Sequence, residues 1–141
     1  MMQFYFLFFQ GILMMERHLF GFIIDHDIQL DIANKRLVRI NSLAPEKWVH
    51  FSAVTLNDAM VSLLVFLLQH HGDGRKFTKA EILQQVWDDN SYSSSSQKLW
   101  QTIKELRLRL DVIGLPHDFI VNVKGAGYTL NNPVVTPLFY E

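Results

Sequence analysis

The chain has 141 residues and a formal net charge of −1 at pH 7, and 49% of its residues are hydrophobic and 19% charged. This length and composition are typical of one ordered globular domain, with hardly enough chain for two. The absence of cysteine excludes disulfide scaffolds, thiolate metal sites and cysteine nucleophiles. It fits a reducing compartment, and we expect a cytoplasmic protein. Because the net charge is near zero, binding to nucleic acid would require a local basic surface.

Residues 1–15 form an apolar N-terminal segment that contains the aromatic run Phe4–Phe9. The segment is shorter than the roughly 20 apolar residues of a membrane-spanning helix. It also lacks the basic start and small-residue cleavage site of a secretory signal, so no membrane anchor is expected. Three interpretations remain open: a tail that is unstructured or results from a start codon assigned too early, an internal contact of the fold, or a partner-binding segment.

Residues 20–51 contain short clusters of β-branched and aromatic residues with polar turns between them. Ile28–Ile32 alternates apolar and polar side chains, as a strand with one solvated face does. Asp25–Asp27 and the pair Asn34-Lys35 are suitable turns. The pattern predicts a small antiparallel sheet with strands in the clusters Phe22–Ile24, Ile28–Ile32, Leu37–Ile40 and Trp48–Phe51.

Two helices are predicted next. The first runs from an N-cap at Asn57 to about His70, with Gly72 placed to end it. It has almost no polar face, so we expect it to be covered on several sides. The second runs from Thr78 to Trp87, and its Thr78-Lys79-Ala80-Glu81 start is a capping box.

A third helix and a hairpin complete the pattern. At 100° per residue, the third helix, from about Ser95 to Leu110, places Leu99, Ile103, Leu106 and Leu110 on one narrow arc. Strand, glycine turn and strand follow in residues 119–130. The order of elements predicts an α+β winged helix-turn-helix with an N-terminal antiparallel sheet, three helices and a C-terminal β-hairpin wing. We expect this domain to span residues 16–131, with residues 132–141 as a C-terminal tail.

Four motifs occur in the order and spacing of a known family. They are the opening helix from Leu56 to Gly72, the segment Phe77–Trp87 ending in valine-tryptophan, the Ile103–Arg109 core of the third helix, and the Lys124-Gly125-Ala126-Gly127-Tyr128 turn. Residues 20–130 thereby resemble the winged helix-turn-helix effector domain of bacterial OmpR/PhoB-type response regulators and ToxR/CadC-type regulators. The resemblance implies a transcriptional regulator that lays its third helix in the major groove of duplex DNA and its wing against the minor groove.

The residue types in these elements are suited to contacts with DNA bases and phosphates. Glutamine can pair bidentately with adenine, and lysine reaches phosphate or guanine. Residues 95–110 carry four basic side chains against one acidic side chain, a local charge of +3. Backbone amides at helix N-termini and at the wing turn suit phosphate oxygens. The candidate DNA contacts are Thr78, Lys79, Ser95, Ser96, Gln97, Lys98, Trp100, Gln101, Lys104, Glu105, Arg107, Lys124 and Gly125.

The sequence contains no set of nucleophile, base and orienting group, no phosphate loop and no metal-ligand spacing, so we expect neither enzyme activity nor a cofactor or metal. One alternative function keeps the fold. Met60 and Val65 enlarge the apolar surface of the first helix, which the aromatic N-terminus of the same chain, a partner protein or a second copy could cover. With the near-neutral charge and Glu105, they favour a dimerising or protein-binding co-regulator that does not bind DNA productively.

Overall fold

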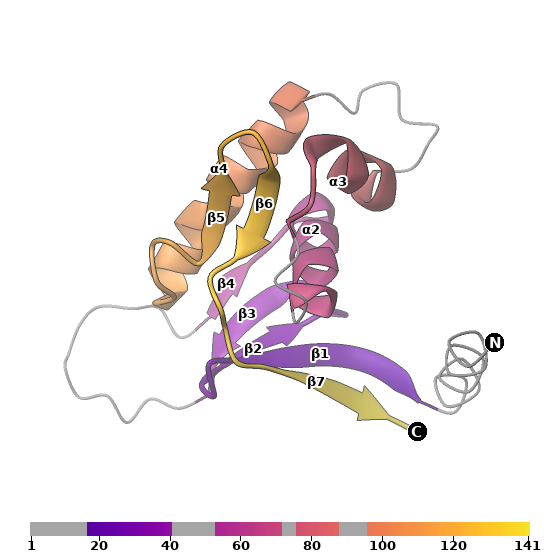
Figure 1. The fold of residues 1–141 in the computed structure, drawn as a ribbon. Helices are drawn as coiled ribbons and strands as arrows, with labels where there is room; N and C mark the ends of the chain where they lie inside the picture. The colour runs from indigo at the N-terminus through magenta and orange to yellow at the C-terminus, as the bar shows by residue number, and fades with distance from the viewer. Residues whose placement is uncertain (1–16, 41–52, 72–75, 88–95) are drawn as a thin grey trace.

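The computed structural model describes residues 17–40, 53–71, 76–87 and 96–141 (Figure 1). Five antiparallel strands form its larger sheet, in the order β4-β3-β2-β1-β7. The expected strand at Trp48–Phe51, the stop at Gly72 and the segment 1–15 lie outside the described residues. The strands of this sheet are β1 (His18–Ile24), β2 (Ile28–Asp31), β3 (Arg36–Arg39), β4 (Ala53–Thr55) and β7 (Val135–Tyr140).

The two turns predicted between the first three strands are confirmed. Asp25 and His26 have φ of 50° and 70°, values that aspartate, asparagine and histidine tolerate best among residues other than glycine. Lys35 also has a positive φ, of 53°. In the second turn the side-chain amide of Asn34 donates to the Asp31 carboxylate at 2.8 Å. This hydrogen bond lowers the pKa of Asp31, because it stabilises the charged carboxylate.

The three predicted helices are α2 (Asp58–Gln69), α3 (Lys79–Val86) and α4 (Ser96–Ile113). Asn57 caps α2 as expected, since its side chain accepts a hydrogen bond from the Met60 amide at 2.9 Å. α4 runs three residues beyond the predicted end at Leu110, because Ile113 continues its buried side. The helix ends at Gly114, whose φ is 102°, a conformation that glycine adopts without a steric penalty.

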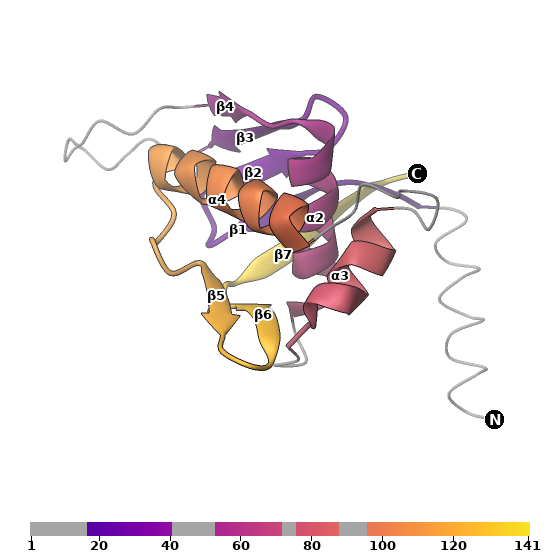
Figure 2. The ribbon, with the colours of Figure 1, turned by 90° about the horizontal axis from the view of Figure 1, so that it is seen from above.

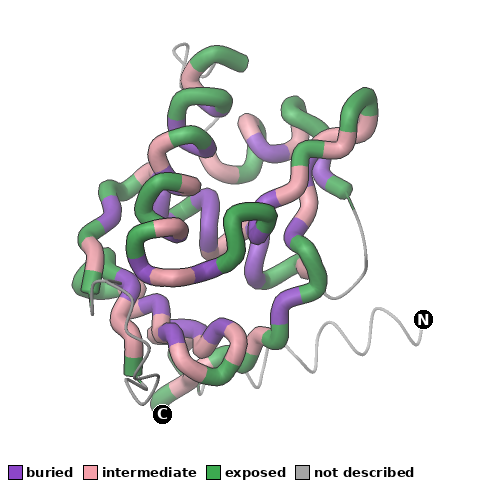
Figure 3. The backbone as a smooth tube through the Cα atoms, turned by 90° about the vertical axis from the view of Figure 1, so that its left-hand side faces the viewer, coloured by how far each residue is buried: buried purple, intermediate pink, exposed green. Residues whose placement is uncertain are grey.

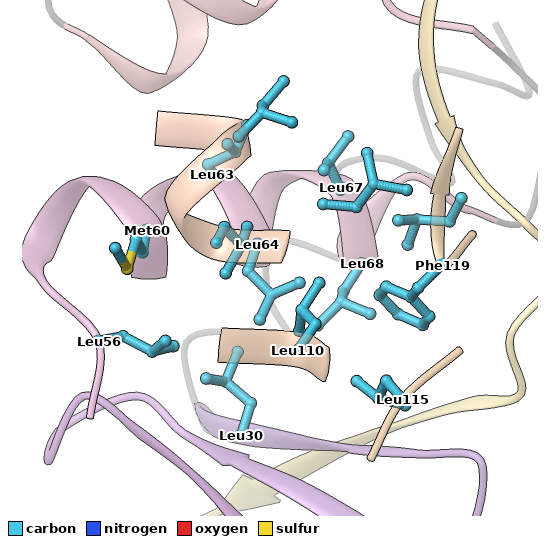
Figure 4. Packing of buried hydrophobic residues seen from close by; sticks show 14 of the residues in the cluster. Leu30, Leu56, Met60, Leu63, Leu64, Leu67, Leu68, Leu110, Leu115 and Phe119 are labelled. Atoms are coloured by element: carbon cyan, nitrogen blue, oxygen red, sulfur yellow. The ribbon is translucent and has the colours of Figure 1, made fainter. Parts of the chain in front are cut away.

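The hydrophobic core lies where α2 and α4 cover one face of the sheet (Figures 1 and 2). The strand register places Phe22, Leu30 and Leu37 side by side on that face, and all three are buried. Leu64 and Leu68 of α2 and Leu110 of α4 meet above them (Figure 4). The tube in Figure 3 shows the resulting pattern, with buried segments inside and exposed turns outside.

A separate two-stranded hairpin forms the expected wing from β5 (Ile120–Val123) and β6 (Gly127–Leu130). Phe77, just before α3, adds an isolated bridge to this hairpin. Its amide donates to the carbonyl oxygen of Tyr128, and the Tyr128 amide donates to that of Phe77, both at 2.8 Å. The start of α3 is therefore joined to the wing through the main chain.

The C-terminal segment expected as a tail contains a strand of the main sheet. β7 pairs with β1 along its length, with Pro137 opposite Phe22 and Val135 opposite Ile24. The amide of Asp25 also donates to the carbonyl oxygen of Val134 at 2.8 Å. Proline is tolerated here because β7 is an edge strand, where a missing donor can face outward. The folded region therefore continues to Tyr140 and does not stop at residue 131.

Candidate nucleic-acid interface

The N-terminus of α3 has the capping box predicted from the sequence. The Thr78 hydroxyl accepts from the Glu81 amide at 3.1 Å, and the Thr78 amide donates to a Glu81 carboxylate oxygen at 3.2 Å. These bonds fix the first turn and orient its remaining amides outward along the helix axis. Lys79, the next residue, is exposed. The end of α3 thus presents a partial positive charge together with a lysine.

The wing turn lies against this helix end. Thr78 and Lys79 share a cleft of about 470 Å³ with Lys124 and Gly125. Gly127, with φ of 125°, closes the turn where a Cβ atom would lie 1.9 Å from the carbonyl oxygen of Phe77. The two lysines, which are 45 positions apart in the sequence, therefore flank the same cleft.

α4 presents the polar face that the sequence predicts. Leu99, Ile103, Leu106 and Leu110 are buried, and Thr102 joins them by donating from its hydroxyl to the carbonyl oxygen of Lys98 at 2.9 Å. The side chains expected to contact DNA lie on the opposite side. Exposed residues there are Ser96, Gln97, Trp100, Gln101 and Lys104. Ser95 lies outside the described residues.

Several of these polar side chains have neighbours within the protein. The Lys98 ammonium lies 5.8 Å from the centre of the Trp87 ring, and that of Lys104 lies 5.2 Å from the Trp100 ring. These contacts are within the range of cation–π attraction. The side-chain amide of Gln101 is 3.5 Å from a Glu105 carboxylate oxygen. Glu105, the acidic candidate, thus pairs along the helix with one of the two glutamines.

The two arginines of α4 bind main-chain oxygens of other elements. Arg107 Nη2 donates to the carbonyl oxygen of Ile120 in β5 at 2.9 Å. Arg109 Nη1 donates to that of Thr55 in β4 at 2.7 Å. Both contribute to the local charge of +3 in residues 95–110. Arg109 instead binds a strand of the sheet, so the positive charge of the outer face of α4 comes mainly from lysines.

Arg39 is a positioning residue that was not predicted from the sequence. It extends from β3, and its Nη2 donates to the carbonyl oxygen of Ile113 at the C-terminus of α4. Its Nη1 is 3.1 Å from the Asp27 carboxylate, and only 14% of its side chain is exposed. A local pattern gives no sign of this contact, because its two ends are 74 positions apart.

The structure corrects one partner hypothesis. Met60, expected on an apolar surface of the first helix, is only 2% exposed and belongs to the core. Val65 is half-buried and packs against the same core. The sheet, α3 and α4 cover most of α2, so Met60 cannot bind a partner protein. Large apolar side chains are exposed instead on α4, where Trp100 is 57% and Leu108 is 58% exposed.

Trp100 and Leu108 flank a second groove, of about 350 Å³, between α4 and the wing. Trp87, which follows α3, is half-buried and packs against the hydrophobic core. Nowhere in the described ranges are three or more histidine, aspartate or glutamate side chains grouped to hold a metal ion. None of the helices described is long and apolar enough to cross a membrane.

Comparison with known proteins agrees with this architecture. A family model described as "Transcriptional regulatory protein, C terminal" matches residues 52–130. The protein RcaC of Microchaete diplosiphon is 30% identical over 79 residues, which make up 56% of this chain and 11% of that protein. The chain thus corresponds to a small part of this relative's length.

Three solved structures share the fold. The DNA-binding domain of E. coli CadC has a TM-score of 0.63 and 21% identity, over 86% of this chain and 99% of that one. The DNA-binding domain of the response regulator AdeR, in complex with an intercistronic region, has a TM-score of 0.55 and 18% identity, over 76% and 96%. The C-terminal domain of the nisin resistance regulator NsrR has a TM-score of 0.53 and 24% identity, over 72% and 89%.

Proposed function

The chain belongs to the family of transcriptional regulatory proteins whose C-terminal DNA-binding domain matches residues 52–130, and from this premise we propose that α4 enters the major groove of duplex DNA. The β5–β6 wing then lies against the adjacent minor groove. The family consists of regulators and not enzymes. The observation that carries the proposal is that the exposed N-terminal half of α4 presents Gln97, Gln101 and Lys104, and that Lys79 and Lys124 flank the cleft between α3 and the wing.

The N-terminal half of α4 is suited to reading bases. A helix fits the major groove, and the side chains of its exposed face reach base edges. Gln97 and Gln101 are one turn apart on that face, and each can pair with an adenine. Lys104 is placed for guanine or phosphate. The hydrogen bond between Gln101 and Glu105 holds the amide along the helix before DNA arrives, and pairing with a base would replace it.

Contacts to the DNA backbone are assigned to the two sides of the cleft. The amides at the start of α3, with Lys79, would bind one phosphate, and Lys124 with the Gly125 amide would bind another. Ser95 and Ser96 are proposed to contact phosphate at the start of α4, with Lys98 at its edge. Trp100 is proposed to contact the sugar-phosphate backbone beside the wing. Arg107, already bonded to Ile120, contributes more to the position of the wing than to DNA contact.

Fluorescence anisotropy with random-sequence and selected duplexes, titrated with salt, tests the proposal. Lys124→Ala should weaken binding to all sequences and reduce the slope of log K against log salt by about 1. Gln101→Ala should change the preferred sequence, with a loss of about 1–3 kcal/mol at the preferred base. Lys35→Ala is the matched control, because it removes the same charge from an exposed turn of the sheet.

The alternative, a protein-binding co-regulator, predicts a different outcome. The burial of Met60 removes part of its support, while Glu105 and the exposed Leu108 remain. A folded protein that binds no duplex even at low salt would contradict the DNA proposal and favour this alternative. Equal effects of Lys124→Ala and Lys35→Ala would contradict the assignment of the wing.

A further inference from the structure

An apolar groove lies away from the proposed DNA surface. It has a volume of about 450 Å³ and separates the C-terminal end of α2 from the ends of β1 and β7. In Figure 1 both strands run on beyond α2, so that part of their helix-facing side has no helix above it. The groove is lined by Leu19 and Phe22 of β1, by Leu68 of α2 and His70 just after it, and by Val135 and Phe139 of β7, among others.

The lining determines what kind of group fits. It contains no aspartate, glutamate, lysine or arginine, and its polar members are Gln69 and the pair His70 and His71. Leu19 and Val135 are only partly buried where they pack against the core. An occupant that covers them would remove apolar surface from water without desolvating a charged side chain. The groove therefore suits an uncharged, apolar segment.

The first described residue lies at the edge of this groove. The Arg17 guanidinium is 5.6 Å from the centre of the Phe139 ring, and Phe139 is a lining residue. The sixteen residues before it are attached at that point, and residues 1–15 contain no charged side chain. Seven residues separate Phe9 from Arg17 and can extend over roughly 23 Å. The distance from Arg17 to Phe22 along β1 is shorter, about 17 Å, so the aromatic run can reach the whole groove.

We propose that Phe4–Phe9 docks in this groove and covers the exposed part of the inner face of β1 and β7 in its own chain. Attachment at the rim keeps the run at a high effective concentration, which favours this occupant over a second molecule in dilute solution. The run is the only stretch of six consecutive residues in the sequence with four phenylalanines. A binding site of matching polarity lies within its reach.

Site-directed disulfides test this inference in the full-length chain, which has no cysteine of its own. The variant Phe6→Cys with Gln69→Cys places one thiol in the run and one at the groove. Its matched control combines Phe6→Cys with Leu108→Cys, an exposed position on α4. Under mild oxidation the first pair should form an intrachain disulfide at least about tenfold faster than the control pair, because docking raises the local thiol concentration. Equal rates would overturn the proposal, and an interchain disulfide would assign the groove to a second copy.

Hydrogen exchange gives an independent measurement without new cysteines. Amides of residues 4–9 should exchange at least about tenfold more slowly than their intrinsic rates. The groove variant Phe139→Ser should remove that protection, while Leu108→Ser, a similar change on α4, should leave it intact. Intrinsic exchange rates in the unmodified chain would contradict the docking. Protection that survives Phe139→Ser would contradict the choice of groove.

Discussion

Gly127 and Gly125 both adopt positive φ in the wing turn, but their surroundings differ. A Cβ atom on Gly125 would have no atom within 4 Å beyond its neighbours in the chain, whereas one on Gly127 would lie 1.9 Å from the Phe77 carbonyl oxygen. That oxygen accepts from the Tyr128 amide at 2.8 Å. It cannot move away without loss of the bridge between α3 and the wing. Alanine substitutions at these two glycines therefore distinguish the free-energy cost of an unfavourable backbone conformation from that of a steric clash.

We expect Gly127→Ala to lower the free energy of unfolding by about 3 kcal/mol, from backbone strain and weakened bridge hydrogen bonds together. Gly125→Ala, which carries the conformational cost alone, should lower it by about 1 kcal/mol. Urea denaturation of the two variants measures both values. If the two substitutions cost the same, the clash with Phe77 does not contribute to stability.

Among the elements, α4 is joined by three arginines to β5, β4 and β3. Arg107 binds the oxygen of Ile120, Arg109 that of Thr55, and Arg39 reaches the end of the helix from β3. Hydrogen bonds from a charged donor are stronger than neutral ones. Each acceptor is a main-chain oxygen, so no acidic partner marks the contact in the sequence. The orientation of α4 could not be predicted from its own pattern for this reason.

Replacement of Arg39 by methionine should lower the free energy of unfolding by about 2 kcal/mol, since it removes charged hydrogen bonds from a mostly buried site. Arg39→Lys should lower it by less, because the ammonium can still pair with Asp27. The matched control is Arg36→Met on the same strand, where a more exposed side chain faces Asp31 at 3.5 Å. Such a surface pair should contribute less than about 0.5 kcal/mol.

Thermal and urea unfolding measure these stabilities, and anisotropy with duplex DNA measures the effect on binding. We expect Arg39→Met to weaken binding even where the protein is fully folded, because the C-terminus of α4 is then free to shift. Equal stability of Arg39→Met and Arg36→Met would show that the contact with Ile113 does not hold the helix.

The local elements of the site were accessible to sequence analysis. The capping box of Thr78 and Glu81 involves residues three apart, and the buried stripe of α4 repeats every turn, so both patterns lie within short windows. The cleft between Lys79 and Lys124 is different. The lysines were identified as separate candidates, but the Phe77–Tyr128 bridge brings their elements together, and no spacing rule connects those residues.

At the scale of the whole molecule, the main discrepancy is β7. Two prolines and few alternating residues make 132–141 a weak strand pattern, and its partner β1 is more than a hundred residues earlier in the chain. Pairing between such distant segments is set by the completed sheet and not by local preference. The first and last described segments of the chain thus close the same edge of the molecule, as Figure 1 shows.

Removal of residues 133–141 should therefore lower the free energy of unfolding by about 3 kcal/mol, from the loss of three partly buried apolar side chains, Val135, Leu138 and Phe139. Hydrogen exchange of β1 should also become faster, because one of its two paired edges is exposed. The control lacks only Glu141, which is exposed and follows the strand, and it should match the full chain. An unchanged urea midpoint after the longer deletion would show that β7 adds nothing to the sheet.

The bridge between Phe77 and Tyr128 affects the spacing of the two proposed phosphate contacts. If the amides at the start of α3 and the Gly125 amide each bind a phosphate, the separation of these amides is set by the main-chain bridge with its hydrogen bonds of 2.8 Å, while the flexible side chains of Lys79 and Lys124 add charge. Substitutions of these two lysines can strengthen or weaken DNA binding without changing the distance between the two sets of amides. The wing and the start of α3 therefore keep a fixed separation, and substitutions of Lys79 and Lys124 change only the charge on either side of the cleft.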